Sequence, residues 1–492
     1  MFKKGTPESV GISSAAVQKF IATLDSYHLA THSILMARGD TIFTECYYAP
    51  FHKDFKHRMY SVTKSFVSVA IGLLEEDGKL SLDDKFVQYF PEYENELFND
   101  YLKEATIRDM LTMTTSMCDN LYWFDHVETT GDRAAGYFDR AADRIPGTVW
   151  RYDSYGSYML GAIVEKLSGK PFLQFMQDRF LTAIGFNEDS YCLKSPGKYS
   201  WGDSAILCTS RDLLHFARFV MNYGTWDGKR YMNEAYLRTA TSRLVDNSAC
   251  GFVGYGNYGY GYQIWQAPRG GFAFVGMGDQ FAICDPKTDF IFIITSDNQG
   301  NGESRAILYH TLYKDIVEML GEPLPEDSAA NAALEEFCGS RKLYVFPGET
   351  KNDFAACVSA KTFKLTENRM NIDWMKFDFE GDAGVLTYKN AQGEKKLCFG
   401  LGHNEFQKFP QEGYADEVGG VDEPGHFYDC AVSAAWTEAK KLHIKVQIID
   451  KYFGVLDITV AFKDENRFSL QMVKTAEDFL NEYYGAANGI AE

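Results

Sequence analysis

Residues 60–78 contain the strongest constraint on how this chain can fold. After Ser61, apolar side chains occupy positions that cover most of the circumference of a helix, namely Val62, Phe66, Val67, Val69, Ala70, Ile71, Leu73 and Leu74. A helix that is apolar on nearly every side must be covered by other elements, so we expect it to lie at the centre of a large domain. Gly78 ends the pattern and suits the left-handed residue that commonly follows a helix.

Two polar side chains at the start of this helix are not needed for its packing. Ser61 and Lys64 are three residues apart and therefore share one helix face. A hydroxyl beside an amine, at the positive end of a buried helix, is typical of a nucleophile with an adjacent base. On this pattern alone, a helix-capping serine and a solvated lysine are an equally good interpretation. Ser195-Pro-Gly-Lys198 has the same spacing, but Pro-Gly indicates a turn.

Length, charge and cysteine content limit the classes of function. With 492 residues the chain is too long to fold around a single hydrophobic core. Its net charge of −19 argues against a nucleic-acid or anionic-membrane partner. The N-terminus has no apolar signal-like segment, and no run of 18 apolar residues occurs, so we expect a cytoplasmic protein. The ten cysteines form no Cys-x-x-Cys pair, so neither a metal site nor a disulfide framework is expected, and no cofactor is indicated.

Hydrophobic periodicity predicts two folded domains. The first covers residues 1–322 and contains a helical subdomain at about 80–205. Residues 323–333 have the composition of a linker, and residues 334–492 alternate with period two, which predicts a small antiparallel β domain, either a barrel or a sandwich. Within the first domain we expect helices over 13–27, 105–115, 158–169 and 210–222, and strands over 33–47 (a hairpin), 260–265, 272–275, 280–284 and 289–296.

A second motif makes the chain recognisable. Tyr152-Asp-Ser154 precedes a helix that contains Leu160-Gly161. Together with Ser61-Val-Thr-Lys64, this resembles the serine β-lactamase-like hydrolases, which include class C β-lactamases, penicillin-binding DD-peptidases, and related esterases and amide hydrolases. Members carry Ser-x-x-Lys at a helix start, and Tyr-x-Asn or Tyr-x-Ser before a Leu-Gly-containing helix. The resemblance covers roughly residues 5–320 and implies an α+β fold, with an antiparallel sheet flanked by helices and interrupted by a helical insertion.

The third family motif is where this chain differs. β-Lactamases and DD-peptidases have Lys-Thr-Gly or His-x-Gly on the strand beside the site, whereas residues 271–280 here contain neither. The stretch is closer to the Gly-x-x-Gly-Gln of amide-hydrolase branches, with Asp279 where glycine is usual. Without that cation, β-lactams and D-Ala-D-Ala peptides are less suitable substrates. The resemblance implies an oxyanion hole from the N–H groups of Met277, beside Gly276, and of Ser61; a tight turn at 276–278 is the alternative.

These motifs lead to one main functional hypothesis. We expect a metal-independent serine hydrolase that cleaves a small ester, amide or peptide through an acyl-enzyme on Ser61, and that is not an efficient β-lactamase. The resemblance implies Ser61, Lys64 and Tyr152 as catalytic residues and Ser154 in substrate binding, with either Lys64 or Tyr152 as the base. The alternative is a catalytically weak or inactive binding or scaffold protein on the same fold. The natural substrate, the oligomeric state and the role of the β domain stay open.

Overall fold

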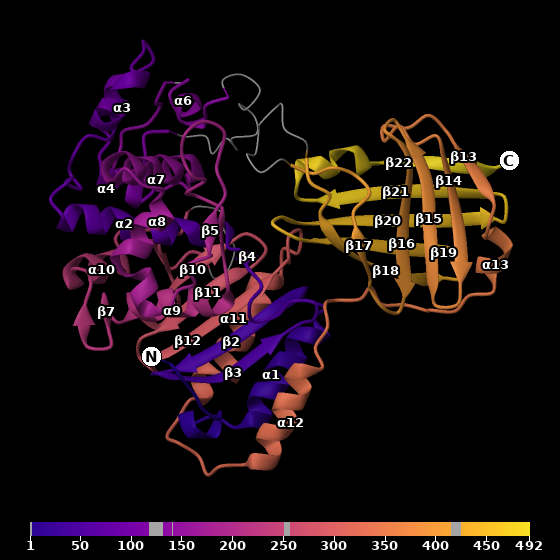
Figure 1. Cartoon of the computed structure of the whole chain (residues 1–492), viewed down its shortest axis with the longest axis horizontal. Helices are drawn as coiled ribbons and strands as arrows, with labels where there is room; N and C mark the ends of the chain where they lie inside the picture. Colours follow the sequence, from indigo (N-terminus) through magenta and orange to yellow (C-terminus); the bar gives the residue numbers. More distant parts are fainter. Residues whose placement is uncertain (1, 118–130, 140, 250–255, 415–424) are drawn as a thin grey trace. The chain divides into compact units, whose positions relative to one another are not determined.

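The chain forms two compact units. The computed structural model describes residues 2–117, 131–139, 141–249, 256–414 and 425–492 (Figure 1). The boundary between the units lies between Lys342 and Leu343. Each unit has its own sheet and its own hydrophobic core, so each is described separately.

A seven-stranded sheet forms the centre of the first unit. Its order is β1-β3-β2-β12-β11-β10-β9, and every pairing is antiparallel except that of β1 with β3. The strands are β1 (Lys3–Lys4), β2 (Thr31–Arg38), β3 (Thr41–Tyr47), β9 (Trp265–Gln266), β10 (Phe272–Gly276), β11 (Gln280–Asp285) and β12 (Phe290–Ser296). Because β2 pairs with β12, strands from both ends of the unit share one sheet, and the helical region is inserted between them.

Helices cover both faces of this sheet. Along β12, Phe290, Phe292 and Ile294 face one core, whereas Ile291 and Ile293 face the other, as the period of two in a strand requires. The first core is covered by α1 (Ser14–Ser26), α11 (Ser304–Asp315) and α12 (Ser328–Gly339). The second is covered by α2 (Thr63–Glu76) and α9 (Ser210–Met221), whose capping box joins Thr209 and Asp212.

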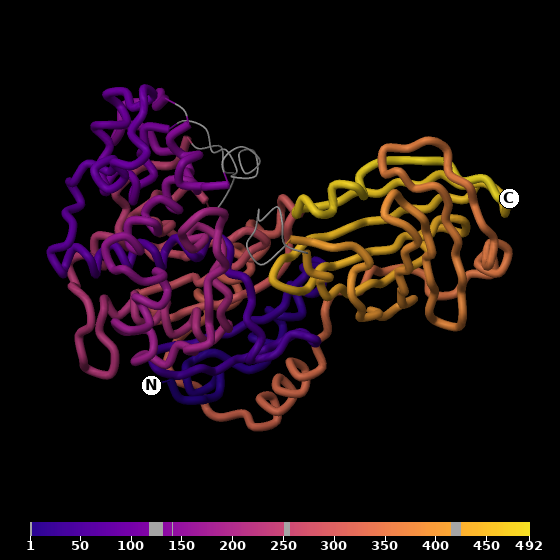
Figure 2. Tube along the Cα trace, turned by 45° about the horizontal axis from the view of Figure 1, so that its top comes forward, coloured from indigo at the N-terminus to yellow at the C-terminus, as the bar shows by residue number. Residues whose placement is uncertain are grey.

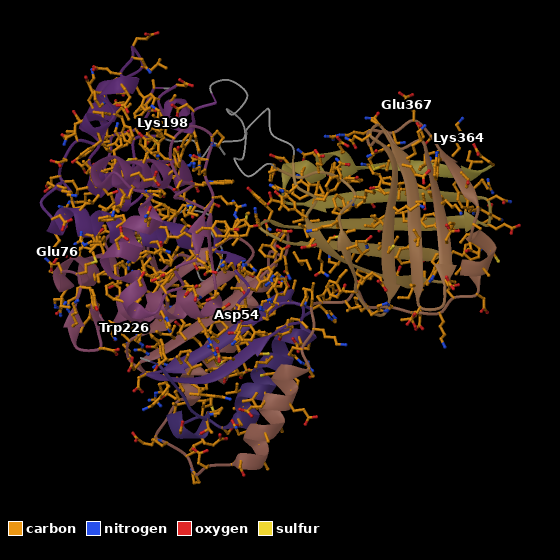
Figure 3. All side chains as sticks on the ribbon, viewed as in Figure 1. Asp54, Glu76, Lys198, Trp226, Lys364 and Glu367 are labelled. Atoms are coloured by element: carbon orange, nitrogen blue, oxygen red, sulfur yellow. The ribbon has the colours of Figure 1, made fainter. Side chains whose placement is uncertain are left out.

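Helix α2 is buried as its sequence predicts. Its residues from Thr63 to Leu74 are all buried, and only its C-terminal end is exposed, where Glu76 lies at the surface (Figure 3). The α-helix begins two residues later than predicted, because Tyr60–Val62 form a 3-10 turn, η2. Gly78 has a φ of 67° and its N–H donates to the carbonyl of Glu75, which is the expected role at the helix end.

The inserted region packs mainly through α7 against α2. Gly161 of α7 faces Gly202, and a Cβ on either would lie 3.4 Å from the other Cα, so the helix and the loop approach closely. The helices here are η3 (Phe86–Tyr89), η4 (Pro91–Tyr93), α3 (Asp100–Glu104), α4 (Ile107–Leu111), α6 (Arg133–Tyr137), α7 (Ser154–Ser168), α8 (Phe172–Met176), the π-helix η6 (Gln177–Leu181) and η7 (Thr182–Ile184). Smaller elements of the unit are η1 (Glu8–Val10), β4 (His57–Arg58), β5 (Tyr191–Cys192), β6 (Ile206–Cys208), β7 (Thr225–Trp226), β8 (Lys229–Arg230), α10 (Glu234–Ala240), η8 (Pro268–Gly270) and η9 (Val317–Met319).

The strand predicted over residues 260–265 is wrong for most of its length. Only Trp265 belongs to a strand, β9. The N–H groups of Tyr262 and Gln263 instead donate to the carbonyls of Ala240 and Leu111, at the ends of helices α10 and α4. The backbone here therefore joins helices to the sheet edge, and its aromatic side chains are buried for that reason.

Helix α12 occupies residues that the sequence divides between a linker and the second domain. Its buried residues Leu334 and Cys338 join the core formed by α1 and one face of the sheet. Both views show α12 beside α1 (Figures 1 and 2). Arg341, just after the helix, forms an ion pair with Asp25 of α1 at 3.0 Å, so the first unit extends to Lys342.

The second unit is a sheet closed on itself, in which every pairing is antiparallel except the one that closes the ring. The strands follow the order β16-β15-β14-β13-β22-β21-β20-β19-β18-β17, and a further pairing of β16 with β18 closes the ring, which makes the domain a barrel and not a sandwich. Alternating residues such as Leu442, Ile444 and Val446 are buried, as predicted. The elements are α13 (Phe354–Val358), β13 (Thr362–Leu365), β14 (Trp374–Glu380), β15 (Ala383–Asn390), β16 (Gly393–Leu401), β17 (Glu405–Lys408), β18 (Asp429–Glu438), β19 (Lys441–Ile449), β20 (Phe453–Asp464), β21 (Arg467–Thr475), η10 (Asp478–Tyr483) and β22 (Gly485–Ala491).

Candidate active site

Ser61 and Lys64 are in direct contact at the start of α2. Lys64 Nζ donates a hydrogen bond to Ser61 Oγ at 2.8 Å and another to the backbone carbonyl of Asp203 at 2.7 Å. Lys64 is 1% exposed, whereas Ser61 is half-buried and accessible. This is the arrangement in which an amine can accept a proton from a hydroxyl.

The residue before Ser61 has an unusual backbone. Tyr60 has a φ of 45°, a conformation that non-glycine residues seldom adopt. Burial of its ring and the guanidinium of Arg58, 4.7 Å from the ring centroid, hold it in place. Such strained positions concentrate where a side chain must be presented in one orientation, here the hydroxyl of Ser61.

Tyr152 lies beside the same lysine. Lys64 Nζ is 5.1 Å from the centroid of the Tyr152 ring, which stacks on Trp265 with centroids 5.7 Å apart. Burial and the nearby Tyr152 raise the pKa of Tyr260 well above its usual value. The structure therefore brings Ser61, Lys64 and Tyr152 together, although they come from different parts of the sequence.

Helix α7 begins directly after Tyr152 and fixes its position. Asp153 is the N-cap of this helix: its carboxylate accepts from the N–H of Gly156 at 2.8 Å and from the hydroxyl of Thr115 at 2.9 Å. Ser154, the first helical residue, is half-buried. The Tyr-x-Ser motif is thus a helix start, held from both sides by one buried carboxylate.

The end of strand β10 lies against the backbone that leads to Ser61. A Cβ at Gly276 would collide with the carbonyl oxygen of Met59, so only glycine fits there. The next residue, Met277, is 45% exposed. Of the residues predicted for an oxyanion hole, Gly276 therefore marks a close approach of β10 to η2, and Met277 follows at the surface.

Gln280 fixes the turn that follows Met277. Its side-chain amide donates to the carbonyls of Met277 at 2.9 Å and Ser296 at 2.6 Å, and its Oε1 accepts from the N–H of Ser296 at 3.1 Å. Three backbone groups are thereby tied to one buried side chain. The glutamine of the Gly-x-x-Gly-Gln pattern therefore stabilises the turn through hydrogen bonds to its backbone.

Asp279 is an unusual residue in this turn. It has a φ of 67° and is buried, and burial raises the pKa of its carboxyl above the usual 3.8, although Ser304, Arg305 and Asn298 act in the opposite direction. The glycine that the family pattern has at this position would carry neither the strain nor the buried charge.

The sequence did not reveal two buried groups that support the site. Asp203 accepts from Lys64 through its backbone, and its carboxylate pairs with Arg133. Gln263 joins three helices: its amide donates to the carbonyl of Met110 at 2.8 Å, its Oε1 accepts from Ser157 at 2.6 Å, and its own carbonyl accepts from Ser65 at 2.9 Å. A buried polar residue in an aromatic stretch, as in Gly261-Tyr-Gln-Ile-Trp265, is the signal that could have identified Gln263.

Neither a metal cluster nor a membrane helix is found in the ranges that the structure describes. No three His, Cys, Asp or Glu side chains there are grouped to hold a metal ion. Over the same residues, no helix has both the length and the apolar character needed to cross a membrane.

Comparison with known proteins identifies the family of the first domain. The family model described as Beta-lactamase matches residues 16–313. The 6-aminohexanoate-dimer hydrolase of Paenarthrobacter ureafaciens is 21% identical over 285 residues, covering 54% of this chain and 71% of its own length. Esterase EstB of Burkholderia gladioli is 25% identical over 166 residues, covering 31% of this chain and 42% of its own.

A solved structure shares the fold. EstCE1, a hydrolase with promiscuous acyltransferase activity, superimposes with a TM-score of 0.51 at 16% identity, over 61% of this chain and 99% of its own. Together with the family match, this confirms the α+β fold predicted for the first domain. The relatives named here are all hydrolases.

Proposed function

The chain belongs to the β-lactamase family, and on that premise we propose that it is a serine hydrolase that cleaves a small ester or amide through an acyl-enzyme on Ser61. The observation that carries the proposal is the 2.8 Å hydrogen bond between Lys64 Nζ and Ser61 Oγ, because a serine hydroxyl needs an adjacent base to become nucleophilic. Tyr152, whose ring centroid lies 5.1 Å from Lys64 Nζ, is the second proton carrier.

The proposed reaction has two halves. In the first, Ser61 Oγ bonds to the substrate carbonyl carbon while its proton passes to Lys64 or Tyr152. The tetrahedral intermediate then expels the alcohol or amine, which takes up that proton. In the second half, water attacks the acyl-enzyme, gives its proton to the same groups, and releases the acid and the free Ser61 hydroxyl.

The negative oxygen of the intermediate needs hydrogen-bond donors. We assign this role to the backbone N–H groups of Ser61 and Met277, an effect typically worth about 10²–10³ in rate for each donor. The close approach of Gly276 to Met59 supports this assignment, since it brings β10 next to the segment that carries Ser61. Gln280 would keep the second donor in place.

The proposed substrate class follows from the absence of a cationic side chain in residues 271–280. Residues 271–280 contain neither Lys-Thr-Gly nor His-x-Gly, so no cation on this strand is available for the carboxylate of a β-lactam. A neutral ester or amide makes no such demand, and the relatives are named as a 6-aminohexanoate-dimer hydrolase and an esterase. We therefore rank esterase or amidase activity above β-lactamase activity.

A matched pair of serine variants tests the proposal. The wild-type chain, Ser61→Ala and Ser195→Ala are each incubated with a fluorophosphonate probe and with p-nitrophenyl acetate. Ser195 has the same Ser-x-x-Lys spacing, but its hydroxyl is buried against Tyr158 at 3.0 Å. We expect labelling and hydrolysis to disappear in Ser61→Ala alone, and Lys64→Ala to lower the acylation rate by about 10²–10⁴.

Three results would change the proposal. Without Ser61-dependent labelling in the wild-type chain, the binding or scaffold alternative becomes the better one. Efficient nitrocefin turnover would show that the missing cation does not exclude β-lactams. Full acylation in Lys64→Ala would move the role of base to Tyr152.

A further inference from the structure

Asp203 offers two different acceptors to its neighbours. Its backbone carbonyl accepts from Lys64 Nζ at 2.7 Å, whereas its carboxylate accepts from both Nη atoms of Arg133, at 2.7 and 3.2 Å. The side chains of Arg133 and Asp203 are only 3% and 5% exposed, so this ion pair is buried. Asp203 thus contacts the proposed base, Lys64, through its neutral carbonyl oxygen, while its carboxylate oxygens bind Arg133.

Arg133 is held in place by aromatic rings. It is the first residue of α6, and its guanidinium carbon lies 4.3 Å from the ring centroid of Tyr158 and 5.1 Å from that of Tyr155. The Tyr155 hydroxyl donates to the carbonyl of Arg133, and the N–H of Arg133 donates to Pro196 at 3.1 Å. The guanidinium is therefore fixed, and the Asp203 carboxylate is fixed with it.

The segment around Asp203 also supports the start of α2. The N–H of Met59 donates to Ile206 at 2.8 Å, and the N–H of Ile206 donates to the Thr63 hydroxyl at 3.1 Å. Arg58 donates to the carbonyl of Ser204 at 3.2 Å. The distance from Asp203 to Lys64 is thus set by several bonds besides the Arg133 pair.

We propose that Arg133 is a positioning residue for Lys64: by binding the Asp203 carboxylate, it keeps that charge from pairing with the lysine and leaves Lys64 facing neutral oxygens. The inference rests on the proposed function, in which Lys64 must lose its proton to act as a base. If the carboxylate were released, rotation about the Asp203 side chain would bring it towards the ammonium, because both acceptors belong to the same residue. A carboxylate at that position would favour the ammonium form of Lys64 over the neutral amine.

The other charged groups around α2 do not act as a counter-charge to Lys64. Among the described residues, Lys64 has no carboxylate partner. On α7, Glu165 accepts from the N–H groups of Phe172 and Ser200, and α8 has no charged side chain. On α10, Tyr236 reaches the Ser68 carbonyl, further along α2, and Glu234 pairs with Arg230 and Arg238. Arg58 of β4 lies over Tyr60 and Trp201.

The test is the pH dependence of kcat/KM for p-nitrophenyl acetate. An opposite charge a few ångströms away commonly shifts a titration by about 1–3 units, so we expect the acid limb of the profile to move about 1–2 pH units upward in Arg133→Met. Asp203→Asn leaves the arginine charge unbalanced, and its acid limb should move to lower pH. The double variant carries neither charge and should return close to the wild-type profile. Arg133→Lys keeps the charge and should shift least.

A second buried arginine provides the structural control. Arg218 of α9 is 6% exposed and pairs with Asp289, without any contact to Ser61, Lys64 or Tyr152. Arg218→Met should lower Tm and leave the pH profile unchanged. If Arg133→Met also lowers Tm and leaves the acid limb where it is in the wild type, the pair is only structural and the proposal is overturned.

A direct titration separates this proposal from the proposed function. The chain is labelled with ¹³C at the lysine ε-carbons, and the Lys64 signal is identified by its loss in Lys64→Arg. The midpoint should rise in Arg133→Met and fall in Asp203→Asn, even if the wild-type chain hydrolyses nothing. If Arg133→Met does not fold, the downward shift in Asp203→Asn and its reversal in the double variant carry the test. Unmoved midpoints overturn the proposal.

Discussion

At the scale of single residues, Gly276 controls the distance between two backbones. Its missing side chain lets β10 approach the carbonyl of Met59, two residues before the proposed nucleophile. A methyl group at Gly276 must push these segments apart, because the obstacle is backbone and cannot rotate away. The oxyanion donors that we assign to Ser61 and Met277 would then be separated.

We therefore predict that Gly276→Ala lowers both stability and activity. Overpacking of this kind typically costs about 1–3 kcal/mol in the free energy of unfolding, and loss of one oxyanion donor lowers kcat by about 10²–10³. Thermal unfolding and p-nitrophenyl acetate hydrolysis measure the two effects. Gly302→Ala is the control, since its Cβ meets nothing within 4 Å and should change neither quantity. Normal activity in Gly276→Ala would argue against the proposed oxyanion hole.

Asp279 makes stability depend on pH. Its pKa in the folded chain is raised above 3.8 by burial, so the folded state binds this proton more tightly than the unfolded state does. The resulting stabilisation is complete below the unfolded pKa and is lost as pH rises through the folded pKa. At neutral pH the buried carboxylate is therefore unfavourable.

We predict that Asp279→Asn raises Tm at pH 7 and has a smaller effect near pH 4. Asn keeps the shape of the side chain and tolerates the left-handed backbone, so the change mainly removes the charge. Asp289 is the matched control: it also has a positive φ, 53°, in the next turn, but its carboxylate pairs with Arg218. Asp289→Asn should lower Tm at pH 7. Equal Tm differences at both pH values for Asp279→Asn would contradict the linkage.

At the scale of elements, the start of α7 places Tyr152. Asp153 caps the helix, and its carboxylate also accepts from the hydroxyl of Thr115, a residue that follows α4 in the chain. Removing the carboxylate leaves the first turn of the helix uncapped and leaves the buried Thr115 hydroxyl with only the more distant carbonyl of Met117, at 3.4 Å. Tyr152, the residue before the cap, loses its anchor at the same time.

We predict that Asp153→Ala costs about 1–3 kcal/mol in stability and lowers kcat about 10–100-fold, because Tyr152 is displaced. Asp327, the cap of α12, accepts from the N–H of Ala330 at 3.0 Å and serves as the control. Asp327→Ala should cost about 1 kcal/mol and leave kcat unchanged. Equal kcat values for the two variants would show that the cap does not position Tyr152.

The elements also show what could be predicted from the sequence. The contact between Ser61 and Lys64 follows from their spacing, and α2, α7 and the barrel strands follow from long periodic patterns. The Asp203 carbonyl could not be predicted, because any residue can offer a carbonyl and this one lies 139 positions away from Lys64. The strand expected over 260–265 failed because the N–H groups of Tyr262 and Gln263 donate to the ends of helices α10 and α4 and not to a neighbouring strand.

At the scale of the whole molecule, α12 decides where the first unit ends. Its composition, rich in alanine, resembles a linker, yet Leu334 and Cys338 are buried in the core with α1. After the helix, the carbonyl of Arg341 accepts from the N–H of Ala49 at 3.0 Å, which adds residues beyond α12 to the same unit. A division of the chain at residue 333 would cut this helix in two.

We predict that residues 1–342 fold and keep Ser61-dependent hydrolysis, whereas residues 1–327 are less stable. Burial of a leucine-sized side chain contributes about 1.5–3 kcal/mol, so loss of α12 should lower the free energy of unfolding by at least about 2 kcal/mol. Leu334→Ala in the full chain is the matched point variant and should cost about 2–4 kcal/mol. Urea unfolding and p-nitrophenyl acetate hydrolysis measure these outcomes. Equal stability of the two truncated chains would show that α12 does not belong to the core. A folded but inactive 1–342 chain would instead assign the barrel a part in catalysis, because every proposed catalytic residue lies before Leu343.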